Sequence, residues 1–218
     1  YQMAFLAFGG SSPGDIQQVH YHWRNDDGNE AGATSMTGGL EDTPAQVFAG
    51  TSTRLRVELS NEGTETSTPV IYRLEYAVAT SGPWTTVGAA GATTSWVMAS
   101  SAFITEGDDT TNIASSTGGV FDENTTFLTD NNGVKDTSSA VATTSLGASQ
   151  FTELEFSIKS TAYATATNGV YYFRITGGGS ALSQYNVYPS ITLIPLTQAH
   201  YRWRSDDEGE KGFNSGTG

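Results

Sequence analysis

Two acidic tracts of the chain carry side chains that could bind a calcium ion. The first includes Asp26, Asp27, Asn29 and Glu30, and the second includes Asp206, Asp207, Glu208 and Glu210. Carboxylate and amide oxygens are the ligands that calcium prefers, although the spacing is not that of the twelve-residue EF-hand loop. Asp and Asn also stabilise turns by bonding to their own backbone. We therefore expect a polar turn whose acids pair with Arg24 and Arg204, with a calcium site at Asp26, Asp27, Asn29, Glu30, Asp206 and Asp207 as the alternative.

The first tract also contains two histidines in a spacing that could bind a transition metal. His20 and His22 lie two residues apart, so they share one face of an expected strand. The second tract has Arg202 at the position of His22, and an arginine does not ligate metals. The sequence therefore argues against a histidine metal site. We expect Tyr21 and Trp23 to point into a core, with the basic residues of the tract outside.

The sequence contains no arrangement that is typical of a catalytic site. All three histidines lie in the two tracts, so no Ser-His-Asp set can be named. Glu153 and Glu155 share one face of an expected strand, and a glycosidase needs two carboxyl groups at a defined separation. A solvated strand face is the simpler interpretation of this pair. We predict that the chain is not an enzyme.

Sugars could interact with the chain in two ways. Trp84, Trp96, Tyr163 and Tyr172 could form an aromatic platform, although core packing is the usual role of such residues. Asn124 begins an Asn-Thr-Thr sequon, which predicts a glycan attachment site in a surface protein. A cell-surface adhesin or carbohydrate-binding module is therefore the alternative function, with surface glycans as partners.

The composition favours an all-β extracellular protein. Among 218 residues there are 25 glycines and no cysteine, so strands and turns predominate and no disulfide forms. The formal net charge of −13 disfavours nucleic acid and anionic membranes as partners. No apolar run approaches the roughly 20 residues of a membrane span. We expect a chain with no membrane insertion and no cofactor other than calcium.

The two tracts are copies of one another. His20 to Glu30 is HYHWRNDDGNE, and His200 to Glu210, 180 residues later, is HYRWRSDDEGE. Seven of these eleven positions are identical, and Gln18 also matches Gln198. A period of this length indicates a row of whole domains rather than a solenoid of small units.

In these tracts the chain resembles large bacterial surface proteins that contain a recurring unit, each copy of which opens with a HYRWRNDDG-type tract. The similar segments include RLRVELSNEG, YRLEYA, FTELEFSI and YYFRITGGG, and the resemblance covers nearly all of residues 18 to 210. It implies a secreted or surface-anchored structural role in a prokaryote, and it implies no catalytic activity.

Alternating residues predict several half-buried strands. Leu55, Val57 and Leu59 point to one face, while Arg54, Arg56 and Glu58 point to the other. Similar patterns occur at 71–76, 151–158 and 171–175. We predict an immunoglobulin-like antiparallel β-sandwich over residues 18–196. A Ser-, Thr-, Gly- and Asp-rich insertion is expected at about 99–150, with irregular or edge-strand structure.

The two ends of the chain suggest how such units could join. Residues 1–17 form an expected extended segment whose apolar residues are candidates for a donor strand: Tyr1, Met3, Phe5, Leu6 and Phe8. Residues 197–218 are the start of the next repeat or a connecting strand, in which Tyr201 and Trp203 could fill the places of Tyr21 and Trp23. We predict a structural repeat of an extracellular filament that joins copies of itself by β-strand addition or by tandem linkage.

Overall fold

The chain folds almost entirely into β-strands, as the alternating pattern predicts. The computed structural model describes residues 14–121, 124–166 and 169–194. Within these ranges the single helical element is the 3-10 turn η1 (Ser115–Thr117). No helix in the same ranges has the length and apolar character needed to cross a membrane.

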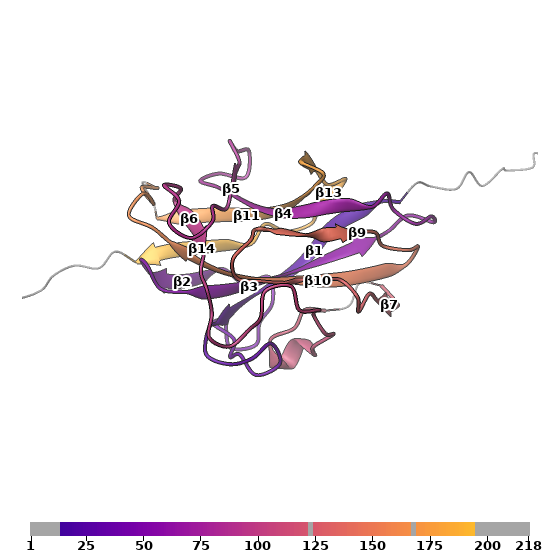
Figure 1. Cartoon of the computed structure of the whole chain (residues 1–218), viewed down its shortest axis with the longest axis horizontal. Helices are drawn as coiled ribbons and strands as arrows, with labels where there is room; N and C mark the ends of the chain where they lie inside the picture. Colours follow the sequence, from indigo (N-terminus) through magenta and orange to yellow (C-terminus); the bar gives the residue numbers. More distant parts are fainter. Residues whose placement is uncertain (1–13, 122–123, 167–168, 195–218) are drawn as a thin grey trace, which may run out of the picture.

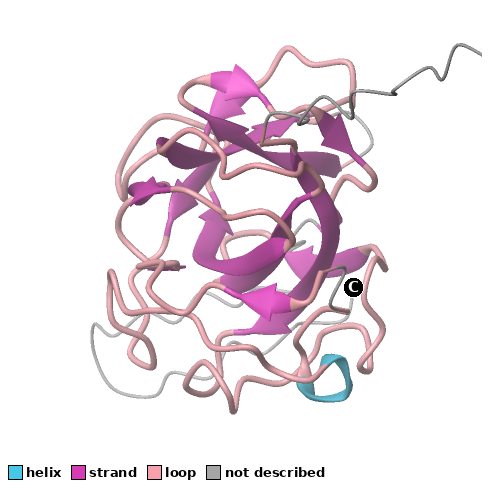
Figure 2. Ribbon diagram, turned by 90° about the vertical axis from the view of Figure 1, so that its right-hand side faces the viewer, coloured by secondary structure: helices cyan, strands magenta, loops and turns pink. Residues whose placement is uncertain are grey.

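The strands form two sheets that pack face to face (Figure 2). The first sheet has the order β13 (Gln184–Tyr185), β1 (Ile16–Asn25), β3 (Thr53–Asn61), β10 (Gln150–Ser160) and β6 (Trp96–Met98), with β7 (Thr126–Phe127) and β8 (Val134–Lys135) paired to β10. The second has the order β2 (Ala45–Phe48), β14 (Ser190–Ile194), β11 (Val170–Gly177), β4 (Val70–Ala77) and β5 (Thr85–Thr86), with β12 (Ser180–Ala181) paired to β11 and β9 (Ala140–Thr144) paired to β4. The predicted all-β sandwich is confirmed.

Seven of the strands lie in the order that immunoglobulin-type sandwiches have. In that arrangement the first, second, fifth and fourth strands form one sheet, and the third, sixth and seventh form the other. The strands β1, β3, β4, β6, β10, β11 and β14, taken in chain order, follow this scheme. Parallel pairs, such as β2 with β14, depart from the fully antiparallel pairing that we expected. The assignment to the immunoglobulin class itself stays a prediction.

Large aromatic side chains fill the space between the sheets. Trp23 from β1 and Trp96 from β6 are both 0% exposed, and both contact the ring of Phe173 on β11, at centroid distances of 5.5 and 5.1 Å. The indole nitrogen of Trp23 also donates a hydrogen bond of 2.9 Å to the carbonyl oxygen of Ser190. Tyr21 is buried in the same core, so the expectation that Tyr21 and Trp23 point inward is confirmed. The expectation that the basic residues of the tract lie outside is wrong, because His22 and Arg24 are buried on the other face of β1.

The outer face of the first sheet is covered as well, contrary to the solvent-exposed face that the alternating pattern predicts. Every residue of β3 is buried, including Arg54, Arg56 and Glu58, so the prediction that these three residues face outward from a half-buried strand is wrong. Residues 101–121, which follow β6 and which we call the covering segment, lie over this face, with η1 on the far side of it (Figure 1). Later in the same connection, β9 pairs with β4 of the second sheet. The backbone of the covering segment is bonded to the first sheet, for example by the 2.9 Å contact between His22 Nδ1 and the carbonyl oxygen of Gly119.

The chain enters and leaves the sandwich at opposite ends of its long axis. Figure 1 shows β1 beginning at the right-hand end and β14 ending at the left-hand end. A unit of this kind can therefore be followed by another unit in line.

We expect the substitution Trp23→Ala to lower the free energy of unfolding by about 3–5 kcal/mol, because it removes a large buried ring and leaves a cavity. The matched control is Tyr163→Ala, since Tyr163 is 54% exposed; it should change the free energy by about 0.5 kcal/mol or less. Urea unfolding followed by tryptophan fluorescence and circular dichroism measures both. Equal losses in the two variants would contradict the placement of Trp23 in the core.

Candidate functional site

The outer face of the first sheet carries a cluster of charged side chains that its three central strands bring together. β1, β3 and β10 are hydrogen-bonded neighbours, and alternate residues of each strand point to this face. Arg24 lies opposite Arg54 in the register, and Arg56 lies opposite Glu155. We call Arg24, Arg54, Arg56, Glu153 and Glu155 the arginine network. All five residues are 0% exposed.

Glu155 is the centre of the arginine network. Its Oε2 atom accepts hydrogen bonds of 2.7 Å from Arg24 and of 2.7 Å from Arg56, and its Oε1 atom accepts one of 3.3 Å from Arg54. The side chain of Arg56 also donates to Glu153 and to the carbonyl oxygen of Thr111 in the covering segment. One carboxylate therefore joins arginines from two strands, and one arginine joins the sheet to its cover.

Two carboxylates of the first tract bind the arginine network at its edge. Asp26 Oδ1 accepts hydrogen bonds from Arg54 Nε and Nη2, at 2.8 and 2.7 Å. Glu30 Oε1 accepts one of 2.8 Å from Arg56 and another of 2.8 Å from the backbone N–H of Thr111. The tract that follows β1 thus folds back over the arginines. Three buried guanidinium groups face four carboxylates.

Burial and charge shift the pKa of two of these arginines in opposite directions. Burial lowers the pKa of Arg24 most strongly, and the positive charges of Arg56 and Arg54 lower it further, against the opposing effect of Glu155. Burial also acts to lower the pKa of Arg56, but the carboxylates of Glu153, Glu155 and Glu30 outweigh it and the pKa is raised. Arginine stays protonated throughout the ordinary pH range. The arginine network is consequently held by fixed positive charges.

Every position that the two tracts share makes a defined contact in this sandwich. In the first tract Tyr21 and Trp23 fill the core. His20 pairs with Asp42, and Asp27 accepts hydrogen bonds from the N–H and hydroxyl groups of Thr34. Arg24, Asp26 and Glu30 bind Glu155, Arg54 and Arg56 as described above. These are the seven identical positions.

The similarity between the tracts continues beyond Glu210. Residues 32–38 are GATSMTG and residues 212–218 are GFNSGTG, which gives four further identities in seven positions. Ser35 and Thr37 are two of these positions, and Ser35 Oγ accepts hydrogen bonds from the N–H groups of Thr37 and Gly39. The second copy therefore retains residues that shape the turn after β1 as well as those of β1 itself.

The predicted calcium ligands of the first tract are bonded to protein donors. Asp26 pairs with Arg54 and Glu30 with Arg56, whereas Arg24 pairs with Glu155, so the expected pairing of the acids with Arg24 is wrong. Asn29 Oδ1 accepts a 2.8 Å hydrogen bond from the N–H of Gly32. In the ranges that the structure describes, no group of three or more His, Asp or Glu side chains is arranged to hold a metal ion. Calcium binding stays a prediction.

The terminal candidates lie outside the described residues. These are Tyr1, Met3, Phe5, Leu6 and Phe8 at one end, and Tyr201, Trp203, Asp206 and Asp207 at the other. Their roles in assembly and in calcium binding stay predictions.

The interpretation of Glu153 and Glu155 as a solvated pair is wrong. Both side chains are 0% exposed, because the covering segment lies over them and arginines of the neighbouring strands bind them. Alternating charged residues in a strand show only that the two faces of the strand differ. In this protein the charged face is buried and forms a second interior. That the chain is not an enzyme stays a prediction.

The side-chain nitrogen of Asn124 is engaged in hydrogen bonds. Its Nδ2 atom donates to Ser60 Oγ at 2.9 Å, to the carbonyl oxygen of Asn61 at 3.0 Å and to Glu62 Oε1 at 3.2 Å. An N-linked glycan attaches at this atom, so attachment would disrupt these contacts. Glycosylation at Asn124 stays a prediction.

The predicted aromatic residues do not form one platform. Trp96 is buried in the core, while Tyr163 is exposed. Trp84 stacks on Tyr188 at 5.6 Å, and the guanidinium carbon of Arg174 lies 4.5 Å from the Trp84 ring centroid. Stacking against protein groups occupies ring faces that a sugar would need.

The partners of Trp84 were not predicted from the sequence. Tyr185 stacks on Tyr188 at 5.2 Å, and Arg174 on β11 pairs with Glu75 directly opposite on β4. The sequence does contain a signal for the ion pair, because Arg174 and Glu75 each occupy an alternate position of a predicted strand and carry opposite charges. The pairing of those strands could not be read from spacing.

The covering segment is fixed to β8 by one further ion pair. Lys135, which is buried, binds the carboxylate of Glu106. Burial alone would raise the pKa of Glu106, but hydrogen bonds from Lys135 and from the N–H groups of Thr137 and Asp136 lower it to about 2. Glu106 is therefore ionised, and its carboxylate holds the covering segment in place.

No family model, curated protein or solved structure matches the chain.

We expect Glu155→Gln to lower the free energy of unfolding by about 3–5 kcal/mol, because three buried arginines would lose their shared countercharge. The matched control is Glu75→Gln, which removes another glutamate that pairs with an arginine on the neighbouring strand. The side chains of Glu75 and Arg174 are 16% and 18% exposed, and we expect a loss of about 1 kcal/mol or less. Urea unfolding of both variants measures the difference. Similar losses would mean that the arginine network is not a special stabilising feature.

The ion pair of Glu106 predicts a pH-dependent contribution to stability. A carboxyl group with a lowered pKa stabilises the fold above its unfolded pKa and loses that effect as it is protonated. The melting temperature of Glu106→Gln should therefore lie below that of the parent at pH 7, and the difference should shrink as the pH falls from about 4.5 towards 2. Exposed Glu65 supplies the control variant Glu65→Gln. A difference that stays constant with pH would exclude the proposed role of the carboxylate.

Proposed function

We propose that this chain is a repeating structural unit of an extracellular filament, in which sandwich follows sandwich along one polypeptide. The observation that carries the proposal is the use of the repeated tract. Its seven recurring residues contact the core, the arginine network or the adjoining turns of the first sandwich. A second copy that keeps those residues has what it needs to open a second sandwich of the same design.

The occupancy of β1 favours tandem linkage over exchange of strands between molecules. The places that Tyr201 and Trp203 would take in an exchanged strand are already filled by Tyr21 and Trp23. β1 pairs with β3 along nearly its whole length, from Ile16 opposite Asn61 to Asn25 opposite Thr53. An incoming copy would have to displace this strand and break the bond from Arg24 to Glu155.

The shape of the unit and the contacts that stabilise it suit a structural role outside the cell, in which each unit adds to the length of a filament. Entry and exit at opposite ends let each unit add its long axis to the array (Figure 1). The fold contains no disulfide, since the chain has no cysteine, and it gains rigidity from two interiors, one aromatic and one ionic. We infer a surface location in a prokaryote, with other copies of the unit as its partners.

A doubled chain tests tandem linkage directly. Gly218 corresponds to Gly38 at the repeat spacing, so residues 1–218 followed at once by residues 39–218 keep the register. We expect two folded sandwiches, and we expect Trp203→Ala to destabilise the second one alone by about 3–5 kcal/mol. In the 218-residue chain the same substitution should leave the unfolding curve of the first sandwich unchanged.

The opposite results would support strand exchange. Oligomers of the 218-residue chain that dissociate on Trp203→Ala, together with a doubled chain that folds only one sandwich, would overturn the tandem proposal. Electron microscopy of the native material tests the filament itself. Filaments with a constant axial repeat are expected, and isolated single units would contradict a structural role.

A further inference from the structure

His22 joins three parts of the protein from a buried position on the outer face of the first sheet. Its side chain is 0% exposed. Its Nδ1 atom lies 2.9 Å from the carbonyl oxygen of Gly119 in the covering segment. Its Nε2 atom lies 2.7 Å from Ser35 Oγ, in the turn that follows the first tract. The ring of His22 therefore holds both the covering segment and this turn against β1.

These two contacts determine which nitrogen of the ring carries the proton. A carbonyl oxygen only accepts hydrogen bonds, so Nδ1 of His22 is protonated and donates to Gly119. Nε2 must then accept, and its donor is the hydroxyl group of Ser35. The imidazole ring is consequently neutral, and both of its nitrogens are satisfied.

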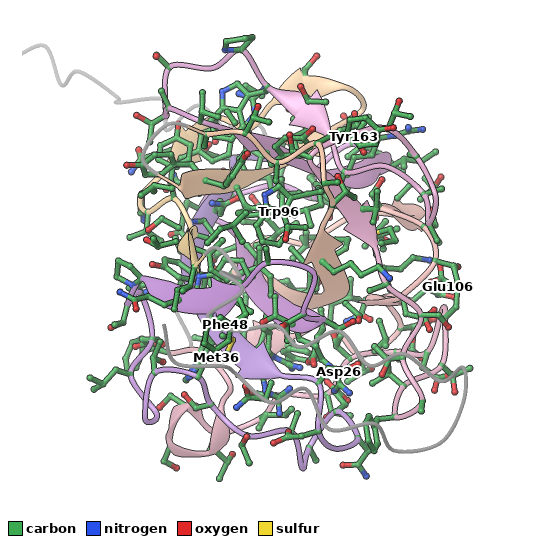
Figure 3. All side chains as sticks on the ribbon, turned by 90° about the vertical axis from the view of Figure 1, so that its left-hand side faces the viewer. Asp26, Met36, Phe48, Trp96, Glu106 and Tyr163 are labelled. Carbon is green, nitrogen blue, oxygen red and sulfur yellow. The ribbon has the colours of Figure 1, made fainter. Side chains whose placement is uncertain are left out.

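The surroundings of Nε2 are unsuited to a second proton on the ring. Ser35 Oγ already accepts hydrogen bonds from the N–H groups of Thr37 and Gly39, at 3.1 and 2.9 Å, so both of its lone pairs are used. Thr37 Oγ1 lies 3.3 Å from Nε2, which is longer than an ordinary hydrogen bond. The turn is also tied to β1, because the N–H of Met36, labelled in Figure 3, donates to the carbonyl oxygen of Trp23 at 3.0 Å.

Fixed positive charges add to the cost of protonating His22. Arg24 lies two residues further along the same face of β1, and Arg56 lies directly opposite His22 on β3. Burial lowers the pKa of His22 most strongly, and the charges of the two arginines lower it as well. The carbonyl group of Gly119 and the carboxylate of Glu41 oppose this shift, but the pKa stays below its usual value of 6.5.

The other charged groups near His22 are engaged elsewhere or lie further along the sheet. Glu41 Oε2 accepts a 2.6 Å hydrogen bond from the N–H of Phe121, and His20 pairs with Asp42. Residues 114–121, the part of the covering segment around Gly119, carry no charged side chain. In the described part of the chain, no carboxylate forms a hydrogen bond with the ring of His22. The remaining charged residues on this face come from β3 and β10, and they are Arg54, Glu58, Glu153 and Glu155.

We propose that His22 is a pH-sensitive latch, which holds the covering segment on the first sheet while it is neutral and releases it in mild acid. A second proton directs Nε2–H at the filled Ser35 Oγ and adds positive charge beside Arg24 and Arg56. The protonated ring therefore turns towards water, and its contact with Gly119 is lost. Release exposes the arginine network, while the aromatic core between the sheets stays closed. The latch belongs to a single unit and does not depend on how units are joined.

Release is expected between pH 6.5 and the lower pKa of the bound ring. A released ring takes up a proton near pH 6.5, whereas the bound ring does so only at lower pH. The closed state is therefore fully favoured above pH 6.5, and it loses at most about tenfold in relative population for each pH unit below that value. This window lies above the one in which Glu106 is protonated, so the two effects are separable.

Hydrogen–deuterium exchange of the 218-residue chain at pH 7.5 and pH 5.5, read by mass spectrometry, measures release. Peptides from the covering segment and from residues 34–42 are compared with peptides from β11, after correction for the intrinsic effect of pH on exchange. We expect protection of the first two regions to fall by at least about fivefold at pH 5.5. β11 should stay protected over the same labelling time, and circular dichroism should show a folded sandwich.

The variant His22→Gln keeps one donor and one acceptor on the side chain but takes up no proton in this range. Its protection should change by less than about twofold between the two pH values. The matched control is His20→Gln, which removes the neighbouring histidine and should keep the fall seen in the parent. A parent that stays protected at pH 5.5, or a His22→Gln variant that loses protection to the same extent, would overturn the latch.

A titration of the His22 ring by nuclear magnetic resonance tests the latch without relying on a variant. We expect the pKa of this ring in the folded parent to lie below 6.5 and the signals of the covering segment to change with the same midpoint. A pKa of 6.5 or above, or a covering segment whose signals do not follow the titration, would contradict the proposal even if His22→Gln failed to fold.

Discussion

The pairing of buried arginines with buried glutamates is the constraint on which the rest of this structure depends. Removing charged groups from water is costly, and it is offset only where the groups are paired and their remaining hydrogen-bonding atoms are satisfied. Glu155 meets arginines from β1 and β3 at once, so one side chain links three strands of the sheet. The second cover determines how much these pairs contribute. An uncovered face would leave these pairs in water, where each would contribute little.

The composition of the covering segment follows from what it must do. A guanidinium group has five N–H donors, so its cover has to offer acceptors as well as bulk. The segment supplies them partly from its backbone, as when the carbonyl oxygen of Thr111 accepts from Arg56. Close approach of the backbone requires small residues. A Cβ atom at Gly119 would lie 1.7 Å from the carbonyl oxygen of Ile113, and one at Gly118 would lie 2.9 Å from Arg24 Nε. A Ser-, Thr-, Gly- and Asp-rich sequence is therefore suited to a polar interior.

Local patterns predicted the strands but could not predict which polar faces are buried. The alternation at Leu55, Val57 and Leu59 correctly identified the core face of β3. The opposite face was assigned to solvent because charged residues usually lie there. Arg56 and Glu155 are 99 residues apart in the chain, and their pairing depends on β3 and β10 being neighbours, which no spacing reveals. The available clue was complementarity: one strand carries arginines at alternate positions and another carries glutamates. Of the candidate sites, the inward direction of Tyr21 and Trp23 followed from periodicity, whereas the partners of Asp26 and Glu30 did not.

The position at which the tracts differ most in chemistry shows how far the design can vary between units. His22 is buried, and burial lowers its pKa, so it is neutral at neutral pH. Its Nδ1 atom contacts a carbonyl oxygen and must carry the proton, which leaves Nε2 to accept from the hydroxyl group of Ser35. The second tract has Arg202 at this position. If the second tract opens a sandwich of the same design, as proposed, Arg202 would add a fourth positive charge to this face, and the cover of that unit would need at least one additional acceptor. In the proposed array, the segment that covers the sheet would therefore have to change together with the tract.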